Sequence, residues 1–222
     1  MSETPPRIRS ALFVPAHRRE FRERAVASGA DAVILDLEDS VPAAARDDAR
    51  AAVVEWFGRG DGPAVLVRIN ALREDCSDAD LDAAVRPGLV AVMVPKVDDP
   101  NTVRRVAEAL DRRERRAGLP PGSVRIWPSI ETAAATRRAF DMASASPRVA
   151  YMGGAAARNG DLAHAIGFGW VPPLFLETLY LRSAILADMR AAHVPNPMTG
   201  VVTNLRDLDE VEAFAPQSPA IG

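Results

Sequence analysis

Residues 32–41 read AVILDLEDSV, an apolar run rich in β-branched residues that closes on three carboxylates. The apolar residues do not alternate with polar ones, as is typical of a parallel strand covered on both faces. Asp36, Glu38 and Asp39 end or follow this expected strand. Burying several unpaired carboxylates is costly, so the pattern predicts a metal, a cationic side chain or open solvent beside them. Helix capping by Asp39 or Ser40 is an alternative that explains one carboxylate but not all three.

The same pattern recurs along the chain, where short apolar runs alternate with amphipathic stretches. We expect strands at Ala11 to Pro15, Ala32 to Leu37, Ala64 to Ile69, Ala91 to Pro95, Val124 to Ile130, Val149 to Met152 and Thr199 to Thr203. We expect helices at Arg19 to Ala27, Ala43 to Phe57, Asp78 to Val85, Asn101 to Ala117, Ala133 to Ala145 and Leu174 to Ala192. Strands that alternate with helices in this way predict a parallel sheet.

Both a doubly wound open sheet and a (β/α)₈ barrel fit this series. No GxGxxG follows the first strand, so a dinucleotide-binding fold has no support. Polar residues at the carboxyl ends of several strands favour the barrel, because a barrel gathers those ends on one face. These residues are Asp36, Glu38, Asp39, Arg68, Asn70, Lys96 and Glu131. The sequence therefore predicts a single (β/α) barrel domain over residues 1–222.

No eighth strand is predicted, and the region after the seventh is interrupted by prolines. Pro216 and Pro219 each remove a backbone donor from what would be the seventh helix. A barrel of seven strands leaves two unpaired edges. Open edges invite pairing with another chain, so we expect a homo-oligomer.

Composition and charge exclude several classes of protein. The formal net charge is −3 and the 27 Lys and Arg are spread along the chain, unlike the concentrated basic patch of a nucleic-acid-binding protein. No apolar run reaches the roughly 18 residues of a membrane span, and the first ten residues contain no apolar signal segment. With Cys76 as the one cysteine, a disulfide within the chain is impossible. We expect a cytoplasmic protein that binds neither nucleic acid nor membranes.

Arg68 is the first candidate for binding a substrate. It lies in VLVRIN, near the end of an expected strand, where its planar guanidinium could hold a carboxylate at two points. A structural ion pair with Glu38 or Asp39 is the alternative interpretation. Both roles can hold at once.

Glu131 and Asp161 are candidate metal ligands. Glu131 closes WPSIET after the fifth expected strand, and Asp161 lies in GGAAARNGDLAHAIG after the sixth. Mg²⁺ prefers oxygen ligands and takes one or two carboxylates together with water and substrate oxygens. By spacing alone, a helix-capping aspartate and a solvated glutamate fit equally well. Gly153 and Gly154 would let backbone N–H groups approach a ligand closely.

The remaining reactive residues do not form a nucleophilic centre. His17 follows the first expected strand, while His164 and His193 are expected on helix surfaces. No serine–histidine–aspartate arrangement is apparent, and Cys76 has no evident activating partner. Nucleophilic catalysis is disfavoured.

The chain resembles the citrate lyase beta-subunit-like family, within the wider HpcH/HpaI aldolase and citrate lyase group, from about residue 9 to the end. The motifs that carry the resemblance are RSALFVPAH, GADAVILDLEDSV, VLVRIN, VMVPKV, SIET and GDLAHAIG. The resemblance implies a TIM-type (β/α)₈ barrel that uses Mg²⁺ to cleave or form a carbon–carbon bond next to a thioester. The implied substrates are acyl-CoA or acyl-carrier-protein esters of hydroxy acids such as citrate, malate or citramalate.

The resemblance also implies roles for individual residues. Arg68 matches the arginine that binds the substrate carboxylate. Glu131 and Asp161 match the metal carboxylates, with Glu131 also near the substrate. Glu38 and Asp39 match an acidic pair that orders the arginine and the water around the metal. The chemistry implied is a retro-Claisen or retro-aldol cleavage.

The chain departs from the family pattern in several places. Gly160 precedes Asp161 after an inserted AAARN, where the family has a shorter loop with an acidic residue. Asn204 stands where an aspartate is common, and the eighth strand and C-terminal lid of the family are missing. The leading hypothesis is a lyase acting on a hydroxyacyl thioester. The alternatives are a 2-keto-acid aldolase acting on free acids and a truncated, inactive paralogue that binds metal without turnover.

Overall fold

The computed structural model describes residues 4–58, 62–72, 76–154, 156–204 and 206–221. They form two compact units. The first unit contains residues 1–95 and 102–127, and the second contains residues 96–101 and 128–222. Each unit is described by itself.

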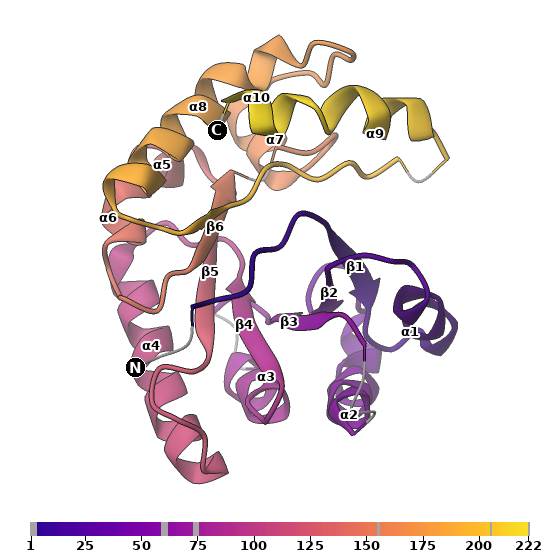
Figure 1. The fold of residues 1–222 in the computed structure, drawn as a ribbon, viewed down its shortest axis with the longest axis vertical. Coiled ribbons are helices and arrows are strands. Elements are labelled where there is room, and N and C mark those ends of the chain that lie inside the picture. Colours follow the sequence, from indigo (N-terminus) through magenta and orange to yellow (C-terminus); the bar gives the residue numbers. More distant parts are fainter. Residues whose placement is uncertain (1–3, 59–61, 73–75, 155, 205, 222) are drawn as a thin grey trace. The chain divides into compact units, whose positions relative to one another are not determined.

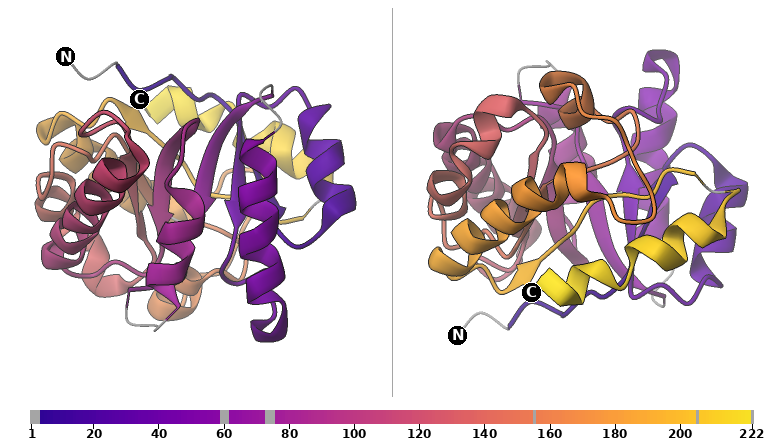
Figure 2. Two further views of the ribbon diagram at one scale, coloured as in Figure 1. Left: turned by 90° about the horizontal axis from the view of Figure 1, so that it is seen from below. Right: turned by 90° about the horizontal axis from the view of Figure 1, so that it is seen from above.

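The first unit is a parallel sheet with helices beside it (Figure 1). Its strands are β1 (Ala11–Pro15), β2 (Ala32–Asp36), β3 (Ala64–Arg68) and β4 (Leu89–Val94), paired in chain order. Its helices are α1 (Arg19–Val26), the 3₁₀ turn η1 (Ala43–Ala45), α2 (Arg46–Phe57), α3 (Ser77–Ala84) and α4 (Pro100–Ala117). Helices α2 and α3 pack side by side against the sheet (Figure 2).

The core of the first unit is formed by the continuous apolar strands. All five residues of β2 are buried, as are Val65 to Val67 of β3 and Ala91 to Val94 of β4. Burial on both faces of a strand is what the lack of alternation predicted. The first three expected strands match the observed ones to within a residue, and the fourth begins earlier, at Leu89.

The second unit contains the carboxyl end of β5 (Arg125–Ile130) together with β6 (Tyr151–Gly154) and β7 (Asn196–Pro197), again parallel and in chain order. Its helices are α5 (Ala133–Thr136), α6 (Ala139–Ala143), α7 (Asp161–Ile166), α8 (Leu176–Ala191), α9 (Leu208–Phe214) and α10 (Gln217–Ile221). Helix α8 packs against α6 and β6. The expected α/β architecture with seven parallel strands is confirmed.

The last expected strand, Thr199 to Thr203, is wrong. The observed β7 is Asn196–Pro197, and Val201 forms only an isolated bridge with Ala157. Proline fits in β7 because alternate residues face the neighbouring strand. The N–H groups of Asn196 and Met198 donate to Ala150 and Met152, so the missing N–H of Pro197 removes no bond on that edge.

Two helix predictions also need correction. The expected helix Ala133 to Ala145 is divided into α5 and α6, because Arg138 leaves the helical conformation at φ −129° and donates to the carbonyl of Asp98. His193 lies in a turn after α8 with φ 59°, and not on a helix. The break at Pro216 is confirmed, since α9 ends at Phe214 and α10 begins at Gln217.

Among the described residues, no helix has the length and apolar content to cross a bilayer.

Candidate active site

The first cluster is built on Arg68, the last residue of β3, and Asp36, the last residue of β2. The two are direct partners in the parallel register of these strands. Arg68 Nε donates to Asp36 Oδ1 at 2.6 Å, and Arg68 Nη2 donates to Asp36 Oδ2 at 2.7 Å. The Asp36 side chain is buried, with an exposed fraction of 2%, and the Arg68 side chain is mostly buried, with an exposed fraction of 13%. Parallel strands therefore place a bidentate, charge-assisted pair at their carboxyl ends.

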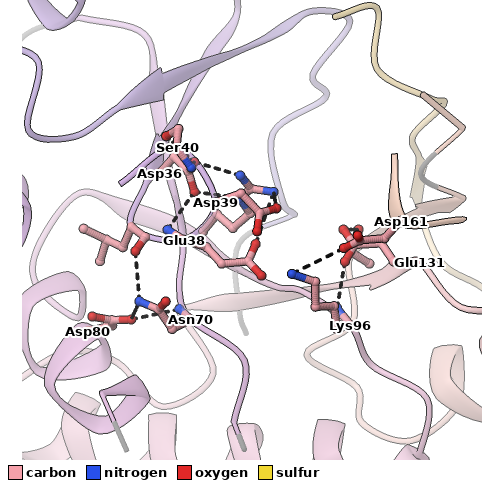
Figure 3. Close-up of polar contacts among 12 residues, drawn as sticks. Asp36, Glu38, Asp39, Ser40, Asn70, Asp80, Lys96, Glu131 and Asp161 are labelled. Carbon is pink, nitrogen blue, oxygen red and sulfur yellow. Dashed lines mark hydrogen bonds and ion pairs between the residues drawn. The ribbon is translucent and has the colours of Figure 1, made fainter. Parts of the chain in front are cut away.

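The remaining nitrogen of the guanidinium faces two further carboxylates. Arg68 Nη1 lies 3.2 Å from Glu38 Oε2 and 3.3 Å from Asp39 Oδ2. Glu38 is buried, whereas the side chain of Asp39 is 55% exposed. The centroid of the Phe13 ring lies 5.1 Å from the guanidinium carbon of Arg68. Figure 3 shows Asp36, Glu38, Asp39 and Ser40 gathered at this point.

The charges of this cluster hold Asp36 ionised. Burial by itself raises the pKa of the Asp36 carboxyl, but hydrogen bonds and charge from Arg68, with hydrogen bonds from Ser40 and the Glu38 N–H, outweigh burial and lower it. Burial by itself lowers the pKa of the Arg68 guanidinium. The hydrogen bond and charge of Asp36, with the charges of Glu38 and Asp39, outweigh burial and raise this pKa above its ordinary value. Arg68 therefore stays cationic.

Both sequence interpretations of Arg68 need refinement. The structural ion pair exists, but its main partner is Asp36, which the sequence did not single out for this role. Asp36 fills one edge of the guanidinium, so a substrate carboxylate would meet Nη1, the nitrogen that Glu38 and Asp39 approach. Three carboxylates therefore approach the guanidinium of Arg68.

A second buried network supports the end of β3. The Asn70 N–H and side-chain amide donate to Asp80 Oδ2 at 2.8 and 2.7 Å, and the amide also donates to the Leu37 carbonyl. Arg50 Nε donates to Asp80 Oδ1 at 2.7 Å. Asp80 is fully buried. Asp80 therefore holds the loop after Arg68 in place. The residues around Asp80 in the sequence did not indicate this role.

Acid is expected to weaken the protein through Asp36. Because the folded-state pKa of Asp36 is lowered, its stabilisation is complete above the unfolded-state pKa of about 3.9 and is lost as the pH falls through the folded-state value. Urea unfolding at a series of pH values should show a steeper loss of stability below about pH 4 in wild type than in Asp36→Asn. Asp47→Asn, a substitution at an exposed position, should keep the wild-type dependence of stability on pH. Equal slopes for wild type and Asp36→Asn would contradict this assignment.

The second cluster lies in the second unit around Glu131, directly after β5. Glu131 is buried, with Oε2 accepting from the Lys96 N–H at 2.9 Å and Oε1 accepting from the Ser129 hydroxyl at 2.8 Å. The Lys96 ammonium lies 3.3 Å from Asp161 Oδ2. Asp161 begins α7 and its side chain is 48% exposed. Lys96 thus links the two carboxylates through its backbone and its side chain (Figure 3).

The donors of this cluster fit Mg²⁺. They are carboxylate oxygens from two residues, and an ionised carboxylate has acceptor sites on both of its oxygens. Within the described part of the chain, no group of three or more His, Cys, Asp or Glu gathers as a metal site. Two protein carboxylates, with water and substrate filling the other positions, match the usual coordination of Mg²⁺.

Other residues noted in the sequence have different roles. A Cβ added to Gly153 would lie 2.2 Å from the Met198 carbonyl oxygen, so this glycine permits close packing beside β7. His17 is half-buried after β1, with no hydrogen-bond partner for Nδ1 among the described residues. His164 is exposed on α7, as expected. Cys76 has the guanidinium of Arg46 3.2 Å from its sulfur, a neighbour that the sequence did not reveal.

Comparison with known proteins agrees with the motifs. Residues 9–222 match the HpcH/HpaI aldolase/citrate lyase family. The chain belongs to this family. It is 34% identical to a citrate lyase subunit beta-like protein from Deinococcus radiodurans, over all of this chain and 75% of that protein. It is 32% identical to citrate lyase subunit beta from Leuconostoc mesenteroides, over 90% of this chain and 65% of that protein.

The solved structures of this family share the fold. A citrate lyase beta subunit from Mycobacterium tuberculosis, complexed with oxaloacetate and magnesium, has a TM-score of 0.75 and 25% identity. The match covers 99% of this chain and 90% of that one. The TIM-barrel type of α/β fold is therefore confirmed. The chain spans about two thirds to three quarters of the length of the two curated relatives above.

Proposed function

We propose that this family member is a Mg²⁺-dependent carbon–carbon lyase that cleaves or forms a hydroxyacyl thioester such as citryl-, malyl- or citramalyl-CoA. The observation that carries the proposal is the pair of carboxylates Glu131 and Asp161, joined through Lys96. Family membership and the magnesium and oxaloacetate named for the M. tuberculosis relative support it.

Glu131 and Asp161 would hold the ion. When bound, Mg²⁺ supplies a Lewis acid that stabilises negative charge developing on a substrate oxygen. The Lys96 ammonium, 3.3 Å from Asp161, would be repelled by a divalent ion at that carboxylate. Its flexible side chain can swing away, while its backbone N–H continues to orient Glu131.

Arg68 would bind a carboxylate of the substrate through Nη1. Asp39 is the carboxylate most easily displaced from that nitrogen, because its side chain is exposed and its contact is the longest in the cluster. Asp36 holds the rest of the guanidinium in place, and Glu38 contributes a buried negative charge. We propose Arg68, Glu38 and Asp39 as catalytic-site residues, with Glu131 also contacting the substrate.

Three expectations from the sequence belong to this proposal. A single barrel domain over residues 1–222, a homo-oligomer and a cytoplasmic location remain predictions. The proposed partners are small molecules, namely acyl thioesters or hydroxy and keto acids.

Product analysis tests the reaction. The purified protein would be incubated with Mg²⁺ and citryl-, malyl- or citramalyl-CoA, and in parallel with the corresponding free acids. Lyase activity releases a 2-oxo acid and acetyl-CoA without free thiol, and Glu131→Gln should abolish it. Keto acid formed only from free acids would favour the aldolase alternative. Metal binding without turnover of any substrate would sink the lyase proposal and favour the inactive paralogue.

A further inference from the structure

Glu210, in the first turn of α9, is a buried carboxylate outside both clusters. Its side chain is 1% exposed. One oxygen accepts from Arg158 Nη2 at 2.7 Å and the other accepts from Trp170 Nε1 at 2.8 Å. A buried carboxylate whose two oxygens accept hydrogen bonds from a cation and an indole holds these donors in fixed positions.

The two donors lie on opposite sides of α7 in the sequence. Arg158 comes shortly before Asp161, the first residue of α7, and Trp170 comes shortly after Ile166, its last. A helix as short as Asp161–Ile166 has too few internal hydrogen bonds to be stable alone. Its placement, and that of Asp161, must therefore come from tertiary contacts, both of its own buried residues Leu162 and Ala163 and of its two flanks.

Aromatic packing fixes α9 against the same segment. Phe214 of α9 lies with its ring centroid 5.5 Å from that of Trp170 and 5.0 Å from that of Phe175. Phe214 is 3% exposed. The apolar contact sets the distance of α9, and the Glu210 bonds can then fix the two flanks of α7.

We propose that Glu210 is a positioning residue for Asp161. By binding Arg158 and Trp170 together, it holds both flanks of α7 and so fixes the carboxylate offered to the metal. The metal part of this inference rests on the proposed function, whereas the ordering of α7 does not.

Glu210→Gln is the informative substitution. Glutamine has nearly the same volume and can still accept from one donor, but its amide faces the other, and Arg158 loses its counter-charge. We expect Mg²⁺ affinity, measured by calorimetry, to fall about 10-fold, the lower end of the loss seen when an outer-shell partner is removed. Hydrogen exchange in the metal-free protein should accelerate at the amides of His164 and Gly167, which donate to Gly160 at the start of α7 and to Ala163 at its end.

Gln217→Ala is the matched control. It removes contacts from α10 to Arg182 and to the Pro173 carbonyl while leaving the bonds of Glu210 in place. It should lower thermal stability without changing Mg²⁺ affinity or exchange in α7. If Gln217→Ala changes Mg²⁺ affinity and hydrogen exchange in α7 as much as Glu210→Gln does, both variants loosen the protein generally and the inference is overturned.

The readouts separate the two proposals. Faster exchange in α7 of Glu210→Gln supports the positioning role even if wild type binds no Mg²⁺, a result that would count against the proposed function alone. Unchanged exchange in α7 overturns the positioning role whatever the metal does. If wild type binds Mg²⁺ and Glu210→Gln binds it equally well, the inference fails and the proposed function stands.

Discussion

Glu131→Gln is expected to remove the stabilisation that Mg²⁺ gives the wild-type protein while leaving the metal-free fold almost unchanged. The glutamine carbonyl can accept from the Lys96 N–H, and its amide can donate to the Ser129 hydroxyl, which rotates to accept. Both hydrogen bonds therefore survive. The negative charge does not, and with it goes a ligand that Mg²⁺ requires.

The size of the effect follows from linkage. Mg²⁺ at about 100 times its Kd stabilises the native state by about 2.7 kcal/mol, equivalent to about 5–10 °C for a chain of this length. Loss of the ligand should weaken binding at least about 100-fold, since an outer-shell partner alone accounts for about 10–100-fold. At the same Mg²⁺ concentration, the unfolding temperature of Glu131→Gln should therefore rise by only about 1 °C.

Differential scanning calorimetry with and without Mg²⁺ measures this shift. Asp161→Asn should behave as Glu131→Gln does. Glu212→Gln makes the same charge change at an exposed position of α9 and should keep the full shift. If Mg²⁺ raises the unfolding temperature of Glu131→Gln and of Asp161→Asn as much as that of wild type, the metal binds elsewhere.

Arg68→Lys is expected to cost most of the catalytic activity. Lysine keeps the positive charge but cannot make the bidentate pair with Asp36 and also present a second nitrogen to a substrate carboxylate. We expect kcat/KM to fall about 100-fold or more, equivalent to about 2.7 kcal/mol of transition-state binding. Stability should fall too, because Asp36 and Glu38 stay buried with a poorer partner.

Arg50→Lys is a matched control for this loss of stability. The side chain of Arg50 is 16% exposed and donates through Nε to the buried carboxylate of Asp80 at 2.7 Å, a monodentate arginine–aspartate pair in the same unit. Arg50→Lys should lower the unfolding temperature as Arg68→Lys does, while kcat/KM stays near the wild-type value. If both variants lose kcat/KM equally, Arg68 acts through the fold and not through the substrate.

Much of the first unit could be predicted from the sequence, because its strands are apolar throughout and end in charged residues. The ends of β2 and β3 were placed within a residue for that reason. Glu131 and Asp161 were found from the family motifs and not from spacing. The pairing of Asp36 with Arg68 could not be read, because it depends on how two separate strands align.

The second unit was harder to predict because its short elements depend on contacts more than on pattern. Strand β7 contains a proline in two residues and is recognisable only from the N–H groups it directs at β6. Likewise, Lys96 has a positive φ of 54°, which no local signal indicated. That conformation accompanies the backbone bond to Glu131.

The lateral pairing of Asp36 with Arg68 bears on how the chain avoids misfolded alignments. Strands β2 and β3 are apolar on both faces up to these residues, so sliding one strand along the other would bury nearly as much apolar surface. A slip by one residue turns each side chain to the opposite face relative to its neighbour. Asp36 would then be buried without a guanidinium, at a cost of several kcal/mol. The ion pair thus selects one alignment among several that hydrophobicity alone would allow.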